Sequence, residues 1–278
     1  MLSPPAAICA GASTAAHHLP HGWTKSKPNM SFPIQAETPV LELEALTKRY
    51  GRKEAVSAVS FTVRQAELVG LLGSNGAGKS STLRMIAGSL APSNGYVRIC
   101  GCDTAEQPAE AKSFIGYLPE VPPLYPEMTV REYLDFACDL KNAAAKNSNP
   151  DNTAWFKSIT SDLEIEDHMS VLIRNLSKGY KQRVGIAAAI ACKPALLLLD
   201  EPVSGLDPRQ VAEFRSMLRS ICSHMAVIIS SHGLLEIASL CTRVIIMNEG
   251  RIVADTSMET LRSSETNLED LFISLTKP

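Results

Sequence analysis

The alternation of apolar and polar positions predicts a strand-rich opening for the folded part of this chain. From Val40, the segment VLELEAL alternates as a half-buried strand does, and residues 55–64 continue in the same manner. Residues 67–90 have the pattern of a strand, a glycine-rich turn and a helix, and a strand returns over 95–103 after the turn PSNG. The chain therefore begins its fold with β-structure.

The middle of the chain has the pattern of helices. Amphipathic segments at 129–145 and 153–165 predict two helices, and the polar loop 146–152 joins them. They indicate a helical insertion that extends over about residues 120–192.

After Leu176, predicted helices alternate with strands that are continuous apolar runs. The expected strands are 195–202, 226–232 and 243–250, and the expected helices between them are 209–221 and 233–241. This order is typical of a parallel sheet covered by helices on both faces. The turn NEG before 251–255 predicts a hairpin, and residues 266–275 predict a short helix capped by Thr266 or Asn267.

Residues 1–37 show neither a helical nor a strand period and are rich in Pro, Ala, Ser and His. This composition predicts a disordered N-terminal extension. A signal peptide is the alternative, but no basic residue precedes the short apolar run, and Gly, Ser and Thr interrupt that run. Whether the chain starts at Met1 or at Met30 stays open.

Composition narrows the classes of function. The 278 residues are 45% hydrophobic and carry 27 basic and 29 acidic side chains, for a formal net charge of −2. No nucleic-acid partner is expected from that balance. The seven cysteines form no CxxC pair, so we expect reduced, structural thiols rather than a disulfide framework or a zinc site. No stretch approaches the roughly 18 apolar residues of a membrane-spanning helix.

The first chemical motif is a phosphate-binding loop. Residues 73–80, GSNGAGKS, match GxxxxGK[ST] between a predicted strand and a predicted helix. Its amides and the helix N-terminus would cradle phosphates, Lys79 would neutralise them, and Ser80 would bind Mg²⁺. The expected nucleotide-binding residues here are Gly73, Ser74, Asn75, Gly76, Ala77, Gly78, Lys79, Ser80 and Ser81.

The second motif is the buried strand LLLLDE. It would deliver Asp200 and Glu201 to the carboxyl edge of the sheet, where open α/β sheets bind ligands. Asp200 would hold Mg²⁺ or its water, and Glu201 would polarise the attacking water. The two motifs together predict a P-loop nucleotidase.

Further motifs identify the kind of nucleotidase. The segment LSKGYKQR, Leu176 to Arg183, is similar to the LSGGQ signature of ABC ATPases, and other marks of that family stand in the expected order over residues 40–255. They are Tyr50 for stacking on adenine, Glu120 at the Q-loop position, SGLD ending at Asp207 after the strand with the carboxylates, and His232 for contact with the γ-phosphate.

The resemblance implies a fold and a mechanism. The fold is α/β, a P-loop NTPase with a mainly parallel core sheet, an antiparallel β subdomain and a helical insertion. The cofactors are ATP and Mg²⁺, with Lys79, Glu201 and His232 in catalysis and Ser80, Asp200 and Glu120 at the metal. In the family, Ser177 and Gly179 of the signature face the γ-phosphate held by a second ATPase subunit, and a separate integral-membrane permease carries the cargo.

Two departures from the family pattern concern charge. Lys178 replaces a signature glycine, and our hypothesis is that it adds a cation near the γ-phosphate, at a helix N-terminus where positive charge is unfavourable. Glu120 stands where many relatives have Gln, which would bring a negative charge to the metal.

The helical region and the short tail 256–278 look like those of ABC-2-type exporters. The resemblance implies a peripheral subunit on the cytoplasmic face of the inner (plasma) membrane. Two rivals stay open: a soluble ABC ATPase clamp in DNA repair or translation, and a nucleotide kinase.

Overall fold

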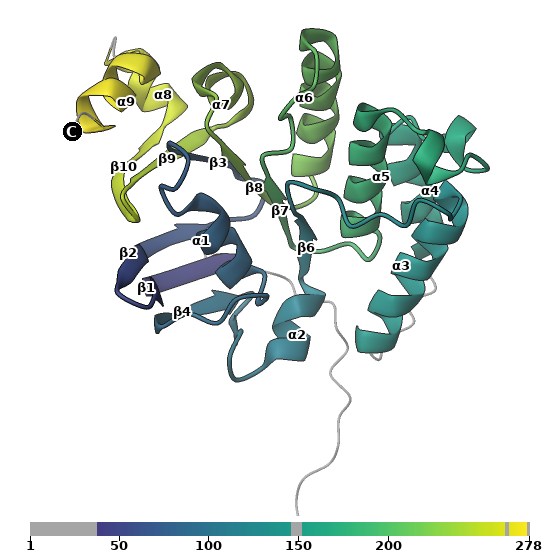
Figure 1. Ribbon diagram of the computed structural model, residues 1–278, viewed down its shortest axis with the longest axis horizontal. Coiled ribbons are helices and arrows are strands. Elements are labelled where there is room, and N and C mark those ends of the chain that lie inside the picture. Colours follow the sequence, from purple (N-terminus) through teal and green to yellow (C-terminus); the bar gives the residue numbers. More distant parts are fainter. Residues whose placement is uncertain (1–37, 146–151, 265–266, 277–278) are drawn as a thin grey trace, which may run out of the picture. The chain divides into compact units, whose positions relative to one another are not determined.

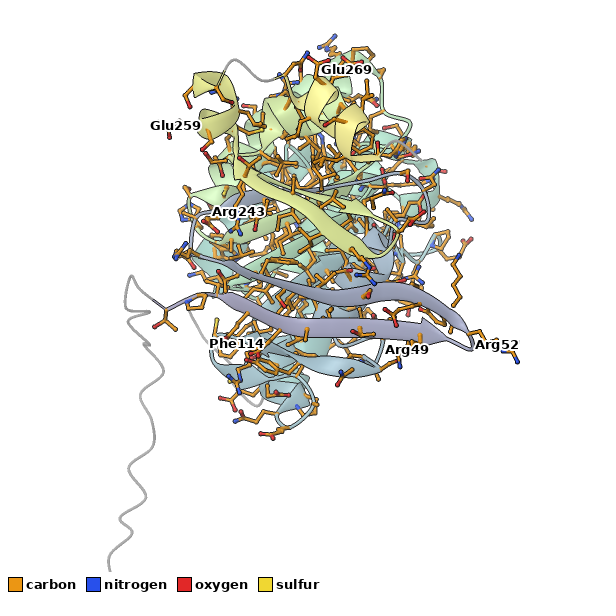
Figure 2. The ribbon with its side chains drawn as sticks, turned by 90° about the vertical axis from the view of Figure 1, so that its left-hand side faces the viewer. Arg49, Arg52, Phe114, Arg243, Glu259 and Glu269 are labelled. Atoms are coloured by element: carbon orange, nitrogen blue, oxygen red, sulfur yellow. The ribbon has the colours of Figure 1, made fainter. Side chains whose placement is uncertain are left out.

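Two β-sheets lie side by side in the computed structural model, which describes residues 38–145, 152–264 and 267–276 (Figure 1). The smaller sheet is antiparallel, with the strand order β2-β1-β4-β5. Its strands are β1 (Leu41–Tyr50), β2 (Lys53–Val63), β4 (Asn94–Ile99) and β5 (Cys102–Asp103). Strands β1 and β2 are joined by a turn that carries Arg52 (Figure 2). The predicted β-rich opening is confirmed.

The larger sheet has the order β10-β9-β3-β8-β7-β6 within the described residues. Its strands are β3 (Leu68–Leu72), β6 (Ile115–Leu118), β7 (Leu196–Asp200), β8 (Ala226–Ser231), β9 (Arg243–Asn248) and β10 (Arg251–Ser257). All neighbours pair in parallel except β9 and β10, which form the predicted hairpin. The α/β fold with a mainly parallel sheet is confirmed.

The apolar runs of the parallel strands are explained by burial on both faces. Leu197 and Leu199 of β7 pack in a core shared with helices, whereas Leu196 and Leu198 pack in a second core shared with the antiparallel sheet. Since successive side chains of a strand point to opposite faces, both faces must be apolar.

The helices follow the predicted order, with two 3₁₀ turns and some short elements added. The α-helices are α1 (Lys79–Ile86), α2 (Pro108–Ser113), α3 (Val130–Ala145), α4 (Asn152–Asp162), α5 (Lys178–Ile190), α6 (Pro208–Cys222), α7 (Leu234–Leu240), α8 (Met258–Ser263) and α9 (Leu268–Thr276), and the 3₁₀ turns are η1 (Glu166–His168) and η2 (Ile173–Asn175). Helices α3, α4 and α5 lie together between β6 and β7 in the chain (Figure 1). The pattern did not predict β6, α2 or α8, which are all short.

Some expectations fall on residues outside the described ranges. They are the disordered extension 1–37 with its alternative start at Met30, nearly all of the loop 146–152, and Thr266 as a cap. Asn267 does act as a cap, because its Oδ1 accepts a hydrogen bond from the amide of Glu269 at 3.2 Å. In the described part of the chain, every helix is too short or too polar to span a bilayer.

Helix α5 lies very close to the edge strand β6. A Cβ atom on Gly116 of β6 would lie only 2.6 Å from the carbonyl oxygen of Ala189, and a Cβ on Gly185 of α5 would lie 2.7 Å from the side chain of Leu118. The contact with the Ala189 backbone is too short for any Cβ, so position 116 needs glycine for α5 to sit at this depth, whereas at Gly185 the Leu118 side chain would have to shift. The position of α5 against β6 therefore depends on glycine at this close approach.

We expect Gly116→Ala to lower the free energy of unfolding by about 2 kcal/mol, because the new methyl group pushes α5 away from β6. Chemical denaturation measures this change. Gly51→Asn is the control: a Cβ at Gly51 meets nothing within 4 Å, and asparagine tolerates the φ of +58° there. If Gly116→Ala were as stable as the control variant, the close approach would not hold α5.

Candidate nucleotide-binding site

The glycine-rich loop has a backbone that only glycine accommodates at several positions. It connects β3 to α1, and Gly76 and Gly78 have φ of +84° and +104°. A Cβ on Gly78 would lie 2.7 Å from the carbonyl oxygen of Ala55, and one on Gly73 would lie 2.5 Å from that of Met247. No side chain caps α1 at Gly78, so the amides at this helix start are available to an anion.

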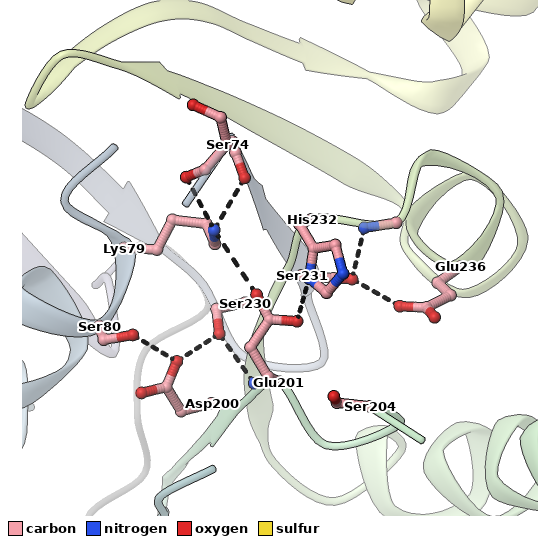
Figure 3. A network of polar contacts seen from close by, with 12 residues as sticks. Ser74, Lys79, Ser80, Asp200, Glu201, Ser204, Ser230, Ser231, His232 and Glu236 are labelled. Carbon is pink, nitrogen blue, oxygen red and sulfur yellow. Dashed lines mark hydrogen bonds and ion pairs between the residues drawn. The ribbon is translucent and has the colours of Figure 1, made fainter. Parts of the chain in front are cut away.

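Lys79, the first residue of α1, is turned back into the loop. Its side chain is only 6% exposed. The Nζ atom donates to the carbonyl oxygens of Gly73 at 2.7 Å and Ser74 at 3.3 Å, and it lies 3.5 Å from Oε1 of Glu201 (Figure 3). A buried ammonium is thus held between loop carbonyls and a carboxylate, beside the amides that would bind phosphate.

Asp200 ends β7 and is buried, with 2% of its surface exposed. Its Oδ1 accepts from Ser80 Oγ at 3.0 Å and from Ser230 Oγ at 2.6 Å. Within the described ranges no ion pair involves this carboxylate, so its charge suits a bound cation. Burial, and then the negative charge of Asp200, raises the pKa of the Tyr117 phenol on β6, which keeps that group neutral.

The donor set beside Asp200 fits Mg²⁺. A hydroxyl and a carboxylate are the hard oxygen ligands that this ion takes, and it completes its sphere with water and substrate phosphates. The described residues contain no cluster of three or more His, Cys, Asp and Glu side chains that would hold a metal without such help. Ser80 and Asp200 are therefore the residues that could bind the ion.

Glu201 follows Asp200 with a left-handed backbone, at φ +47°. Its amide donates to Ser230 Oγ at 2.9 Å, and its carboxylate meets Lys79 on one side and His232 on the other, where Nδ1 lies 2.8 Å from Oε2 (Figure 3). Only 11% of the Glu201 side chain is exposed. The turned backbone points this carboxylate away from Asp200 and toward Lys79 and His232.

A cavity of ≈ 530 Å³, the nucleotide cavity, is lined by residues from distant parts of the chain. Its walls are Tyr50, Lys53, Ala55, Asn75, Gly76, Gly78, Lys79, Ser80, Ser81, Glu120, Glu201, Ser204 and His232. The ring of Tyr50, at the end of β1, is half exposed beside the glycine-rich loop. Of the other loop residues predicted from sequence, Gly73, Ser74 and Ala77 do not line this cavity, although the carbonyls of Gly73 and Ser74 hold Lys79.

The signature residues lie apart from this cavity. Ser177 caps α5, since its Oγ accepts from the amide of Tyr180 at 3.3 Å. Asp207 caps α6 in a capping box with Gln210, and a Cβ on Gly179 would lie 3.4 Å from the same Gln210 side chain. The structure therefore brings Ser177, Gly179 and Asp207 near one another, but it does not bring them to the cavity of their own chain.

Glu120 borders two cavities. Besides the nucleotide cavity it lines one of ≈ 550 Å³, with Val121 and Pro122 of the same loop and Gln182 of α5. Among the described residues, the Glu120 side chain enters no hydrogen bond or ion pair. Its role at the metal stays a prediction.

Sequence reasoning missed several polar residues of the site, among them Lys53 in the cavity wall and the two serines that end β8. Ser230 bridges Asp200 to the amide of Glu201, while Ser231 donates to Glu236 at 2.5 Å and accepts from the amide of Gly233, which fixes the loop after His232. The signal was present in the two serines that end an otherwise apolar strand. The contact of Ser230 with Asp200 could not be seen in the sequence, because it depends on the pairing of β7 with β8 that sets the two residues opposite each other.

Comparison with known proteins shows which family this chain is similar to. A family model described as "ABC transporter" matches residues 56–204. The ABC transporter ATP-binding protein YxlF of Bacillus subtilis (strain 168) is 38% identical over 84% of this chain and 77% of its own length. The bacitracin transport ATP-binding protein BcrA of Bacillus licheniformis is 33% identical over 80% of this chain and 71% of its own. A solved ATP-binding subunit of an ABC transporter superposes with a TM-score of 0.75 at 30% identity, covering 86% of this chain and all of the other.

We expect Ser230→Ala to lower the free energy of unfolding by about 1 kcal/mol and to slow ATP hydrolysis, because both acidic residues lose a shared partner. Chemical denaturation and a phosphate-release assay measure the two effects. Ser216→Ala, on the exposed face of α6, is the control. A variant that keeps the wild-type rate would remove Ser230 from the organisation of the site.

Proposed function

The chain belongs to the ABC transporter family as an ATP-binding subunit and ATPase, and from that premise we propose that it hydrolyses Mg-ATP to drive export through a separate membrane-spanning permease. One observation carries the mechanism: Tyr50, Lys79, Ser80, Glu201 and His232 come from four distant segments and line a single cavity.

The proposed chemistry is in-line attack of water on the γ-phosphate, where positioning and charge stabilisation supply most of the catalysis. Phosphate oxygens would replace the carbonyl partners of Lys79, and this exchange would release the Glu201 carboxylate to accept the proton of the attacking water. His232, which lies against Glu201, would contact the γ-phosphate. Bound Mg²⁺ would supply charge neutralisation, held by Ser80 and Asp200 with Glu120 on the same cavity wall.

The placement of the signature supports a dimer as the active form. Ser177 and Gly179 stand at the start of α5, where free amides favour an anion, yet they do not line the cavity of their own chain. A second copy, or a close homologue, would bring its signature over this cavity and complete the site. Asp207 would lie at the same junction.

The permease would contact the helical insertion beside the Q-loop. The ≈ 550 Å³ cavity is lined by Val121, which is 78% exposed, and by Leu124 and Pro126 of the same loop. Apolar side chains in water at the border of a cavity suit an apolar partner segment. Because Glu120 lines both this cavity and the nucleotide cavity, the loop that carries Glu120 would transmit the presence of bound ATP to the permease.

The proposed direction of transport and the proposed location of the chain rest on its similarity to relatives. The BcrA relative is named for bacitracin transport, and the helical region resembles ABC-2-type exporters. We therefore propose a peripheral subunit at the cytoplasmic face of the inner (plasma) membrane. The ATPase domain would span residues 40–255, including the helical insertion at about 120–192, and 256–278 would form a tail.

We expect Glu201→Gln to abolish hydrolysis and to retain the ATP-bound dimer, because the amide binds no proton while the phosphate contacts persist. Sedimentation with and without Mg-ATP measures the dimer, and phosphate release measures turnover. Glu259→Gln, on the exposed surface of α8, is the control. Unchanged hydrolysis would remove Glu201 from its role, and a monomer with ATP would count against the dimer.

The export proposal is tested by affinity capture of the tagged chain from native membranes in mild detergent. We expect a polytopic membrane protein at comparable abundance. Val121→Asp should release it by placing a charge in the proposed contact, whereas Ile273→Asp, on the exposed side of α9, should not. Capture of only soluble proteins or nucleic acid would favour the clamp of DNA repair or translation instead.

A further inference from the structure

Lys178, which departs from the signature motif, makes a specific contact within its own chain. Lys178 is the first residue of α5, and its Nζ donates to the carbonyl oxygen of Ser204 at 2.6 Å. Positive charge at a helix N-terminus is unfavourable, so a close carbonyl partner offsets the cost of placing an ammonium there. The lysine thus links the signature helix to the loop after β7.

The contact reaches the part of that loop that faces the nucleotide. Ser204 lines the nucleotide cavity, and its amide donates to the carbonyl oxygen of Glu201 at 3.2 Å. Gly205 has a φ of +70°, and a Cβ there would lie 2.5 Å from Nζ of Lys178. The ammonium therefore lies directly against the peptide that joins Ser204 to Gly205.

The helices that flank this contact, α5 and α6, are joined to each other, and the loop after β7 is fixed where it enters α6. Arg183 of α5 forms an ion pair with Glu213 of α6 at 2.7 Å, and its side chain is only 15% exposed. Asp207 caps α6 at the far end of the loop. Since α5 and α6 are joined in this way, the loop between Glu201 and Asp207 has fixed ends, and Lys178 holds its middle.

We propose that Lys178 is a positioning residue for ATP hydrolysis: through the Ser204 carbonyl it fixes the loop that follows Glu201, and so links the signature helix to the hydrolytic carboxylate of the same chain. The inference rests on the ATPase function. It replaces the hypothesis that the lysine acts as a cation toward γ-phosphate, and it makes a different kinetic prediction.

A positioning role predicts a loss in kcat without a loss in ATP affinity. Lys178→Met keeps the length of the side chain and removes the donor, so we expect kcat to fall about 5-fold, as for a lost charged hydrogen bond at a partly exposed site, and KM for ATP to change less than about 2-fold. Lys178→Arg keeps a donor and should recover most of the rate. Lys157→Met, which removes an exposed charge from α4, is the matched control.

A double-mutant cycle tests the contact itself. In Gly205→Ala the new methyl group displaces the ammonium, so kcat should fall. In the Lys178→Ala background the same change should cost less, because only the backbone strain at Gly205 remains. Additive effects would show that Lys178 and this loop do not act together.

ATP-driven dimerisation separates the two roles of the lysine. In the Glu201→Gln background, Lys178→Met should leave the ATP concentration for half-maximal dimerisation within about 2-fold of the parent. A rise of about 10-fold, together with failure of Lys178→Arg to restore the rate, would overturn the proposal in favour of a phosphate contact. Absence of hydrolysis by the wild-type chain would instead count against the ATPase function.

Discussion

The burial of two adjacent carboxylates at the end of an apolar strand is the constraint on which the site depends. Asp200 ends a strand whose side chains are all buried, and Glu201 follows it directly. Charges without partners there would be strongly destabilising. The chain resolves this by turning them apart. Asp200 meets two serine hydroxyls, and Glu201, at φ +47°, meets Lys79 and His232. The glycine-rich loop, β8 and the loop after β8 are all fixed around this pair.

The contacts of Lys79 join the glycine-rich loop to Glu201. Lys79 is bonded to loop carbonyls and paired with Glu201, so the group that would stabilise phosphate also restrains the group that would activate water. Phosphate binding would exchange these partners. In the proposed mechanism, exchange of this ion pair would link phosphate binding to catalysis in a low-dielectric cavity, where charge interactions are strong.

The helical region adds a mechanical element to this chemistry. Gly116 and Gly185 bring α5 close to β6, and Arg183 ties α5 to α6. The signature at the start of α5 and the loop after β7 therefore belong to one packed unit, with Lys178 at their junction. Rigid elements that share a loop transmit small displacements because packed interfaces deform little.

The sequence by itself determined the local chemistry. The glycine-rich loop, the strand ending in Asp200 and Glu201, the alternation of strands and helices and the hairpin after β9 depend on neighbouring residues, whose spacing is visible in the chain. Short elements such as β6, α2 and α8 escaped because a few residues carry too little periodicity. The tertiary structure alone decided which distant groups meet. The register that sets Ser230 opposite Asp200, the contact of Lys178 with the Ser204 carbonyl, and the separation of Ser177 and Gly179 from their own cavity depend on packing between segments far apart in sequence, and no local pattern encodes such distances.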